Sequence, residues 1–113
     1  MVRLRQGDII YVNLDPIQGH EQAGDRPVLI LSSQEVANVS NMFIVSPISN
    51  TSREFPLYHK LRSTNRTTGK VLLDQTRSLD LRSRGVRSSG HDKVSREELE
   101  EIIHKYKLLF EID

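Results

Sequence analysis

The sequence predicts a mainly β fold, a small antiparallel barrel with one helix at its C-terminal end. Short apolar runs rich in β-branched and aromatic residues alternate with turn residues, which is typical of consecutive strands joined by tight connections. The one long amphipathic helical pattern comes last in the chain. At 113 residues, the chain has the length of one domain. We therefore expect residues 1–113 to form a single domain.

Five apolar runs are expected to form strands. They are residues 9–14, 28–31, 42–45, 55–61 and 71–73. The first two are apolar at nearly every position, so burial on both faces is expected. Pro16 and Pro47 are expected to end the first and third strands. Pro56 marks the fourth as an edge strand, because proline lacks the donor that a sheet ladder needs.

Two helix starts are predicted from capping boxes. Ser32 with Glu35 is expected to cap a short helical turn that reaches Asn38, and Ser95 with Glu98 to cap the C-terminal helix. In that second helix the apolar residues recur at steps of three and four, which predicts one buried stripe. The stripe consists of Leu99, Ile102, Ile103, Tyr106, Leu109 and Phe110.

The net charge of +1 hides an uneven distribution. Residues 1–52 have a balance of −2, residues 53–93 of +6 and residues 94–113 of −3. A localised cationic segment favours a nucleic-acid partner, although a solvated basic loop region would give the same count. Within it, residues 82–93 alternate basic residues with Ser and Gly, and we expect a flexible connection or a marginal strand.

Several classes of site are disfavoured by the composition. The absence of cysteine excludes disulfides and thiolate metal sites. The four histidines lack the spacing of metal ligands, and the motifs of phosphate-binding, dinucleotide-binding and serine-hydrolase sites are missing. We expect neither a metal nor a cofactor. No signal peptide or membrane span is visible, so a soluble cytoplasmic protein is expected.

Most of the chemically informative residues lie between the first two predicted strands, in Gly19-His20-Glu21-Gln22-Ala23-Gly24-Asp25-Arg26-Pro27. Its glycines allow a tight turn or a close approach to a ligand. Pro27 biases Arg26 toward extended backbone, and a guanidinium fixed there suits a phosphate. Ser49 would meet Arg26 if their strands are neighbours. Such a pair suggests RNA cleavage by the RNA's own 2′-OH; a solvated hairpin loop and an ordinary turn serine are the alternatives.

These residues also carry a resemblance to the MazF/PemK family of toxin endoribonucleases. Gly7-Asp8-Ile9, Asp15-Pro16 and the segment from Gly19 to Pro27 resemble the family's N-terminal signature. Residues 46–49, residues 74–78 and the C-terminal helix follow in the family's order. The resemblance spans nearly the whole chain, and it implies an SH3-like barrel, MazF/PemK/CcdB-like, that forms a two-fold homodimer.

The resemblance implies a function as well. It implies metal-independent cleavage of single-stranded RNA at a short sequence, leaving a 2′,3′-cyclic phosphate and a 5′-hydroxyl. It also implies neutralisation by an antitoxin whose acidic tail occupies the RNA groove. Residues 51–68 match the family poorly and are expected to help decide which sequence is cut.

The family's catalytic residues fall on two positions of this chain. Its arginine falls on Arg26 and its threonine on Ser49, a change that keeps the hydroxyl but loses the methyl that restricts χ1. We expect this change to lower the rate of cleavage without changing the type of reaction. The predicted RNA-binding positions are Glu21, Gln22, Gly24, Gln75 and Arg77.

Two other functions remain open at this point. A non-catalytic toxin of similar fold would bind a protein target such as gyrase and would depend on the C-terminal helix. A plain RNA-binding module would bind with strong salt dependence and never cut. Mapping the 5′ ends of RNA incubated with the protein separates all three functions.

Overall fold

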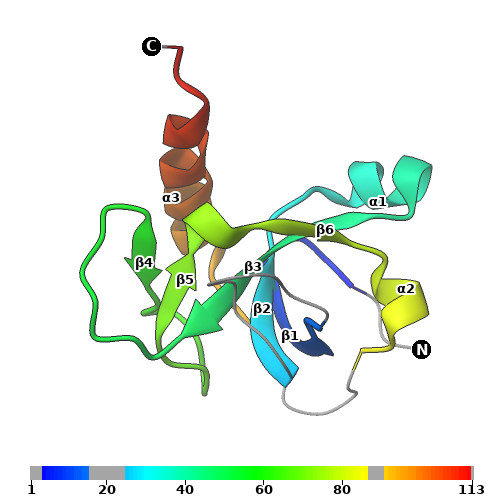
Figure 1. The fold of residues 1–113 in the computed structure, drawn as a ribbon, viewed down its shortest axis with the longest axis horizontal. Helices are drawn as coiled ribbons and strands as arrows, with labels where there is room; N and C mark the ends of the chain where they lie inside the picture. Colours follow the sequence, from blue (N-terminus) through cyan, green and yellow to red (C-terminus); the bar gives the residue numbers. More distant parts are fainter. Residues whose placement is uncertain (1–3, 16–24, 87–90, 113) are drawn as a thin grey trace.

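An antiparallel sheet wrapped into a half-barrel is the framework of the protein (Figure 1). The computed structural model describes residues 4–15, 25–86 and 91–112. Over these residues the sheet has seven strands in the order β4-β5-β3-β2-β1-β7, with β6 paired to β3. The strands are β1 (Asp8–Asn13), β2 (Asp25–Ile30), β3 (Phe43–Ser49), β4 (Tyr58–Lys60), β5 (Lys70–Leu72), β6 (Arg77–Leu79) and β7 (Asp92–Lys93).

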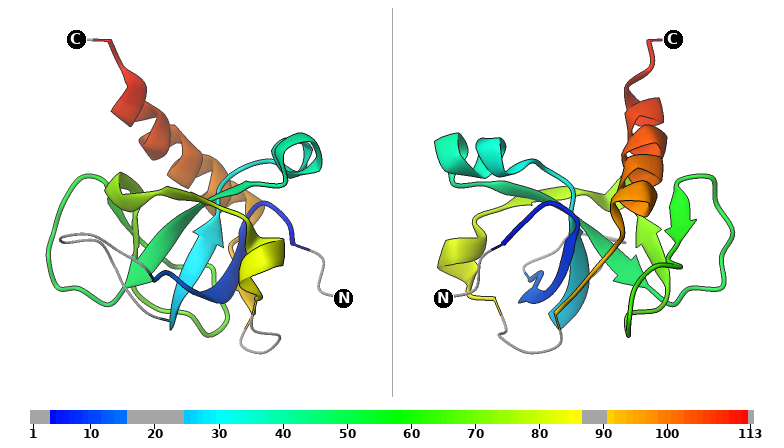
Figure 2. Two further views of the ribbon diagram at one scale, coloured as in Figure 1. Left: turned by 45° about the vertical axis from the view of Figure 1, so that its right-hand side comes forward. Right: turned by 180° about the vertical axis from the view of Figure 1, so that it is seen from behind.

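Helices fill the connections and the C-terminal end. They are α1 (Gln34–Ser40), α2 (Leu81–Arg84) and α3 (Arg96–Lys107), with 3-10 turns η1 (Leu73–Gln75) and η2 (Leu108–Phe110). The C-terminal end of α3 extends away from the sheet in all three views (Figures 1 and 2). Within the described part of the chain, no helix combines the length and apolar character needed to span a membrane.

Strand β3 is the centre of the sheet because it exchanges partners along its length. Its first half pairs with β6 and β2, and its last two residues, Ile48 and Ser49, pair with β5. The prediction that Pro47 ends this strand is wrong. Pro47 occupies the last β2 pair, opposite Val28, directly before the first β5 pair, so its missing donor falls where the strand changes neighbours.

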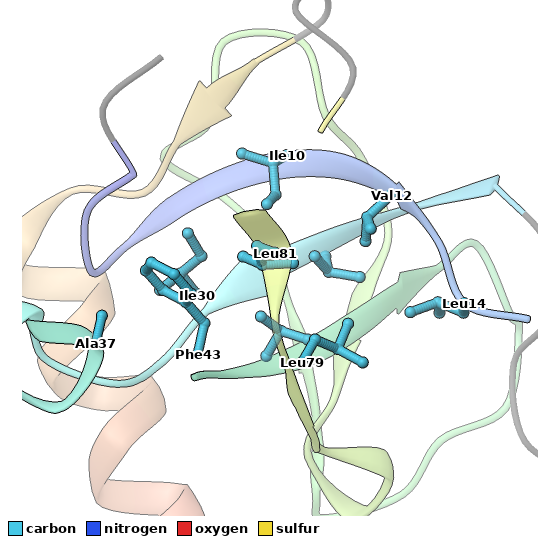
Figure 3. Packing of buried hydrophobic residues seen from close by; sticks show 10 residues of the cluster. Ile10, Val12, Leu14, Ile30, Ala37, Phe43, Leu79 and Leu81 are labelled. Atoms are coloured by element: carbon cyan, nitrogen blue, oxygen red, sulfur yellow. The ribbon is translucent and has the colours of Figure 1, made fainter. Parts of the chain in front are cut away.

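The sheet buries apolar side chains on both faces, as predicted for the first two strands. Ile10 of β1 and Ile30 of β2 belong to one core cluster, whereas their neighbours Ile9 and Leu29 belong to the other. Figure 3 shows the first cluster, in which side chains from β1 meet those of β3 and β6. The second cluster is covered by α3, whose Ile102 is fully buried.

Two elements that the sequence did not predict complete the first cluster. Strand β6 contributes Leu79 and helix α2 contributes Leu81, and both side chains are buried. The Asp80 carboxylate between them caps α2 by accepting a hydrogen bond from the Ser83 N–H at 3.1 Å. The expected flexible connection or marginal strand over residues 82–93 is wrong at its start, where α2 forms, and the two-residue strand β7 lies at its end; residues 87–90 lie outside the described residues.

The predicted first capping box is absent, although its helix forms. The Ser32 hydroxyl accepts a hydrogen bond from the Ile44 N–H at 2.9 Å instead, and helix α1 begins two residues later. Ser33 occupies the cap position of α1 and makes no side-chain cap bond. The Ser32 hydroxyl, which the local pattern predicts as a helix cap, is therefore hydrogen-bonded to β3 instead.

Helix α3 confirms half of the second box and most of the stripe. The Ser95 hydroxyl accepts a hydrogen bond from the Glu98 N–H at 3.1 Å, but the Glu98 carboxylate turns inward to other partners. The stripe is buried or half-buried as far as Tyr106. Leu109 and Phe110 are 39% and 67% exposed, so their predicted burial is wrong, because the chain there extends past the sheet as η2.

Candidate active site

The register of β2 and β3 relates the two predicted catalytic residues. Val28 pairs with Pro47 and Ile30 with Val45. Continuing this register by two residues places Arg26, in β2, opposite Ser49, the last residue of β3. The strands that carry the two residues are neighbours, which is the condition under which the sequence predicts that their side chains converge.

Both residues also share one face of the sheet. Residues two apart in a strand lie on the same face, so Arg26 shares the face of Val28 and Ile30, and Ser49 shares that of Val45. Those three apolar residues belong to the first core cluster, whereas Arg26 and Ser49 are half-buried. The apolar face therefore ends in a guanidinium and a hydroxyl.

Strand β5 approaches Ser49 from the other side. Ser49 pairs with Lys70, and the residue before Lys70 is Gly69, whose φ is +118°. A Cβ added to Gly69 would lie 2.7 Å from the Ser49 carbonyl oxygen and 3.0 Å from Asn50 Oδ1. Only glycine permits this close approach. The requirement for glycine at position 69 could not be predicted from the sequence, because the contact with Ser49 appears only in the structure.

Two arginines hold the end of β1, where residues 16–24 begin. Arg77 donates to the Leu14 carbonyl oxygen. Arg84 donates to the carbonyl oxygens of Asn13 and Asp15, both at 2.9 Å. Arg77 is therefore engaged with the chain that directly follows β1, at Leu14, and its contact with RNA stays a prediction.

The remaining predicted RNA-binding residues are less defined by the structure. Glu21, Gln22 and Gly24 lie outside the described residues. Gln75 is half-buried at the end of η1, next to Thr76, whose hydroxyl lies 3.1 Å from the Tyr106 hydroxyl of α3. Their RNA contacts stay predictions. Over the described ranges, no group of three or more His, Asp or Glu side chains could hold a metal ion.

Comparison with known proteins identifies the family. A sequence model of PemK-like, MazF-like toxins of type II toxin–antitoxin systems matches residues 5–110. The chain belongs to this family. The resemblance to MazF/PemK toxins that the sequence motifs indicate is thereby confirmed.

Relatives and solved structures agree with the family match. The chain is 36% identical over 103 residues to the endoribonuclease toxin MazF of Escherichia coli K12, covering 91% of this chain and 90% of that protein. MazF from Deinococcus radiodurans superposes with a TM-score of 0.81 at 30% identity, covering 95% of this chain and 96% of that one. A MazE–MazF structure from the same organism gives 0.78 at 29% identity, covering 97% of each chain. These MazF folds confirm the predicted fold class.

A buried polar network that the sequence did not predict lies between the sheet and α3. Glu98 and His59 are each 1% exposed, and Glu98 Oε2 lies 2.8 Å from His59 Nε2. Lys105 Nζ lies 2.8 Å from His59 Nδ1. Because an ammonium only donates, Nδ1 accepts and Nε2–H donates to the carboxylate. The network joins β4 to α3.

The Glu98 carboxylate is stabilised in its charged form by its donors. It accepts hydrogen bonds from the Ser63 N–H at 2.9 Å, from the Ser63 hydroxyl and from the Arg62 N–H at 3.1 Å, in addition to His59. Burial acts to raise the pKa of Glu98, but these hydrogen bonds, led by those from Ser63 and His59, outweigh it and hold the pKa below its ordinary value. A charge at the base of α3 therefore fixes the chain that follows β4.

Proposed function

We propose that this protein is a metal-independent endoribonuclease toxin that cuts single-stranded RNA, including mRNA, at a short sequence. The observation that carries the proposal is the β2–β3 register, which pairs Val28 with Pro47 and, continued by two residues, leads to Arg26 opposite Ser49. The naming of the Escherichia coli K12 relative as an endoribonuclease toxin supports the same activity. Glu21, Gln22, Gly24, Gln75 and Arg77 are the proposed RNA contacts.

The reaction is transesterification within the RNA. The ribose 2′-oxygen forms a bond to the adjacent phosphorus as the bond from phosphorus to the 5′-oxygen breaks. The 2′-OH loses its proton and the leaving 5′-oxygen gains one, so the products are a 2′,3′-cyclic phosphate and a 5′-hydroxyl. Negative charge grows on the non-bridging oxygens, where Arg26 donates bidentately and Ser49 adds a further donor.

We further propose a cytoplasmic homodimer that is neutralised by a cognate antitoxin. The MazE–MazF structure from Deinococcus radiodurans, which superposes closely, supports the antitoxin. The dimer follows from the resemblance, and it is supported by apolar side chains exposed at the C-terminal end. Those side chains belong to Leu108, Leu109, Phe110 and Ile112.

Cleavage in a chelator tests the proposal. Wild-type protein is incubated with mixed-sequence single-stranded RNA in EDTA, and the 5′ ends of the products are mapped. We expect cuts at one short sequence by the wild type and cleavage about 10²- to 10³-fold weaker by Arg26→Ala, with the fold checked by circular dichroism. Full activity of the variant would refute the role of Arg26, and wild-type binding without products would indicate an RNA-binding module.

A further inference from the structure

A row of polar residues continues from the candidate active site across two more strands. Ser49 pairs with Lys70 of β5, and Lys70 pairs with Lys60 of β4. Paired residues of antiparallel strands lie on the same face of the sheet. With the β2–β3 register continued from Val28 to Arg26, one face carries Arg26, Ser49, Lys70 and Lys60 in sequence across four neighbouring strands. Three of these four residues are cationic.

A cavity lies at the lysine end of this row. Its volume is about 330 Å³, and its lining includes Lys60, Lys70, Asn50 and Thr68. Neighbouring strands are about 4.8 Å apart, so the lysines stand one and two strand spacings from Ser49. Ammonium, amide and hydroxyl groups suit an anion with further hydrogen-bonding groups. A phosphate next to the scissile one meets that description.

The ammonium of Lys70 already has a carboxylate beside it. Lys70 Nζ donates to the Arg53 carbonyl oxygen at 2.7 Å and lies 3.2 Å from Glu54 Oε1. The Lys70 side chain is 11% exposed, whereas that of Glu54 is 91% exposed. The carbonyl fixes the cation in the cavity wall. The exposed carboxylate gains little from the pair and can be displaced by another anion.

We propose that this cavity binds an RNA phosphate next to the scissile one, and that the ammonium groups of Lys70 and Lys60 bind this phosphate. In the absence of RNA, the Glu54 carboxylate forms an ion pair with Lys70, and the phosphate replaces that carboxylate on binding. The inference rests on the proposed nuclease function, which sets the scissile phosphate at Arg26 and Ser49. Glu54 then weakens RNA binding, because each binding event breaks its contact with Lys70. The identity of residue 54 tunes affinity without touching the reacting atoms.

Binding of an uncleavable RNA tests the exchange. The probe is a short, labelled, mixed-sequence 2′-O-methyl RNA, whose attacking oxygen is blocked, and its affinity is measured by fluorescence anisotropy over a salt series. Glu54→Gln should bind about 1.5- to 5-fold more tightly. Glu100→Gln is the matched control, because it makes the same charge change in an exposed pair with Arg96 on α3. The control should bind like the wild type.

Variants of Lys70 test the cation of the ion pair with Glu54. Lys70→Met should bind about tenfold more weakly and reduce the steepness of log affinity against log salt by about 0.7. Lys70→Arg should keep the wild-type affinity and the wild-type salt dependence. In the Lys70→Met background, Glu54→Gln should have no effect. If Lys70→Met does not fold, the affinities of Lys70→Arg and Glu54→Gln still test whether Lys70 binds the phosphate.

Two results would overturn the inference. One is that Glu54→Gln binds no more tightly than Glu100→Gln, and the other is that Lys70→Met keeps wild-type affinity and salt dependence. The proposed nuclease function is judged separately by cleavage of unmodified RNA. Wild-type cleavage with either of those two binding results removes the phosphate site alone. Binding that follows the expectations without any cleavage removes the nuclease function and leaves the cavity as an RNA-phosphate site without a scissile neighbour.

Discussion

Two regions of the fold differ in what they bury besides the apolar core. Strands β1, β2 and the first half of β3 pack through apolar side chains such as Ile10 and Ile30. The region of β4 and α3, which we call the polar side, packs against the second apolar cluster and also encloses a buried acid and a buried histidine, Glu98 and His59. Ser49 stands where the first region passes into the second. From this difference we expect the candidate site to depend both on strand register and on the polar network.

The largest expected effect would come from breaking the polar side. Glu98→Ala leaves His59 and the N–H groups of Arg62 and Ser63 without their acceptor, so unfolding should require about 3–5 kcal/mol less free energy. Urea denaturation measures the loss. Glu100→Ala, on the exposed side of the same helix, should change stability by about 0.5 kcal/mol or less. Equal losses in the two variants would show that the network contributes nothing specific.

The contact between the two regions is tested at Gly69. Gly69→Ala adds a Cβ that meets the Ser49 carbonyl oxygen at 2.7 Å, in a backbone conformation with φ at +118°. We expect a loss of about 1–3 kcal/mol in stability and a loss of RNA cleavage.

A second glycine separates strain from displacement of Ser49. Gly85 also has a positive φ, +79°, but an added Cβ would meet no atom within 4 Å. Gly85→Ala should therefore lose stability while keeping cleavage. If both variants cleave RNA like the wild type, the approach of β5 to Ser49 is not needed for activity.

Acid sensitivity should reside where β7 meets the chain that follows β4. Asp92 accepts hydrogen bonds from the N–H groups of Asn65, Arg66 and Thr67. Burial acts to raise the pKa of Asp92, but these bonds outweigh it and hold the pKa far below its ordinary value of 3.8. Because the folded-state pKa is depressed, the stabilisation is present above the unfolded value and is lost as the pH falls toward the folded one. Asp92→Asn should flatten the fall in unfolding free energy below about pH 4; an unchanged slope would contradict this assignment.

The smallest expected effect is at Ser49. Ser49→Thr restores the methyl that restricts χ1, so less rotamer freedom is lost when the hydroxyl meets the phosphate. We expect kcat to rise by about two- to fivefold, with KM nearly unchanged, in a cleavage assay on the mapped site. A lower kcat would show that the pocket around residue 49 has no room for the methyl.

The apolar side of the fold could be predicted from the sequence, because continuous apolar runs specify buried strands. The sequence leaves open whether β2 and β3 are neighbours, and the structure shows that they pair. Leu79 and Leu81 were missed since each is a single apolar residue in a polar stretch. Pro47 was misjudged because the sequence does not show that β3 changes partners there.

The polar side could not be predicted, because its contacts join residues far apart in the chain. Glu98 reads as an ordinary helix-start acid, yet its carboxylate meets His59, which is 39 positions away. Lys70 reads as part of a basic run, yet its ammonium is fixed in a cavity wall. No periodicity marks such residues, since their burial depends on partners rather than on apolar character.

The central claim is that Arg26 and Ser49 act on the same phosphate, and a double-mutant cycle tests it most directly. Values of kcat/KM for RNA cleavage are measured for wild type, Arg26→Ala, Ser49→Ala and the double variant. We expect each single change to reduce kcat/KM by about 10²- to 10³-fold, with the double variant little worse than the weaker single variant. Fully additive losses, or wild-type activity in either single variant, would contradict the account.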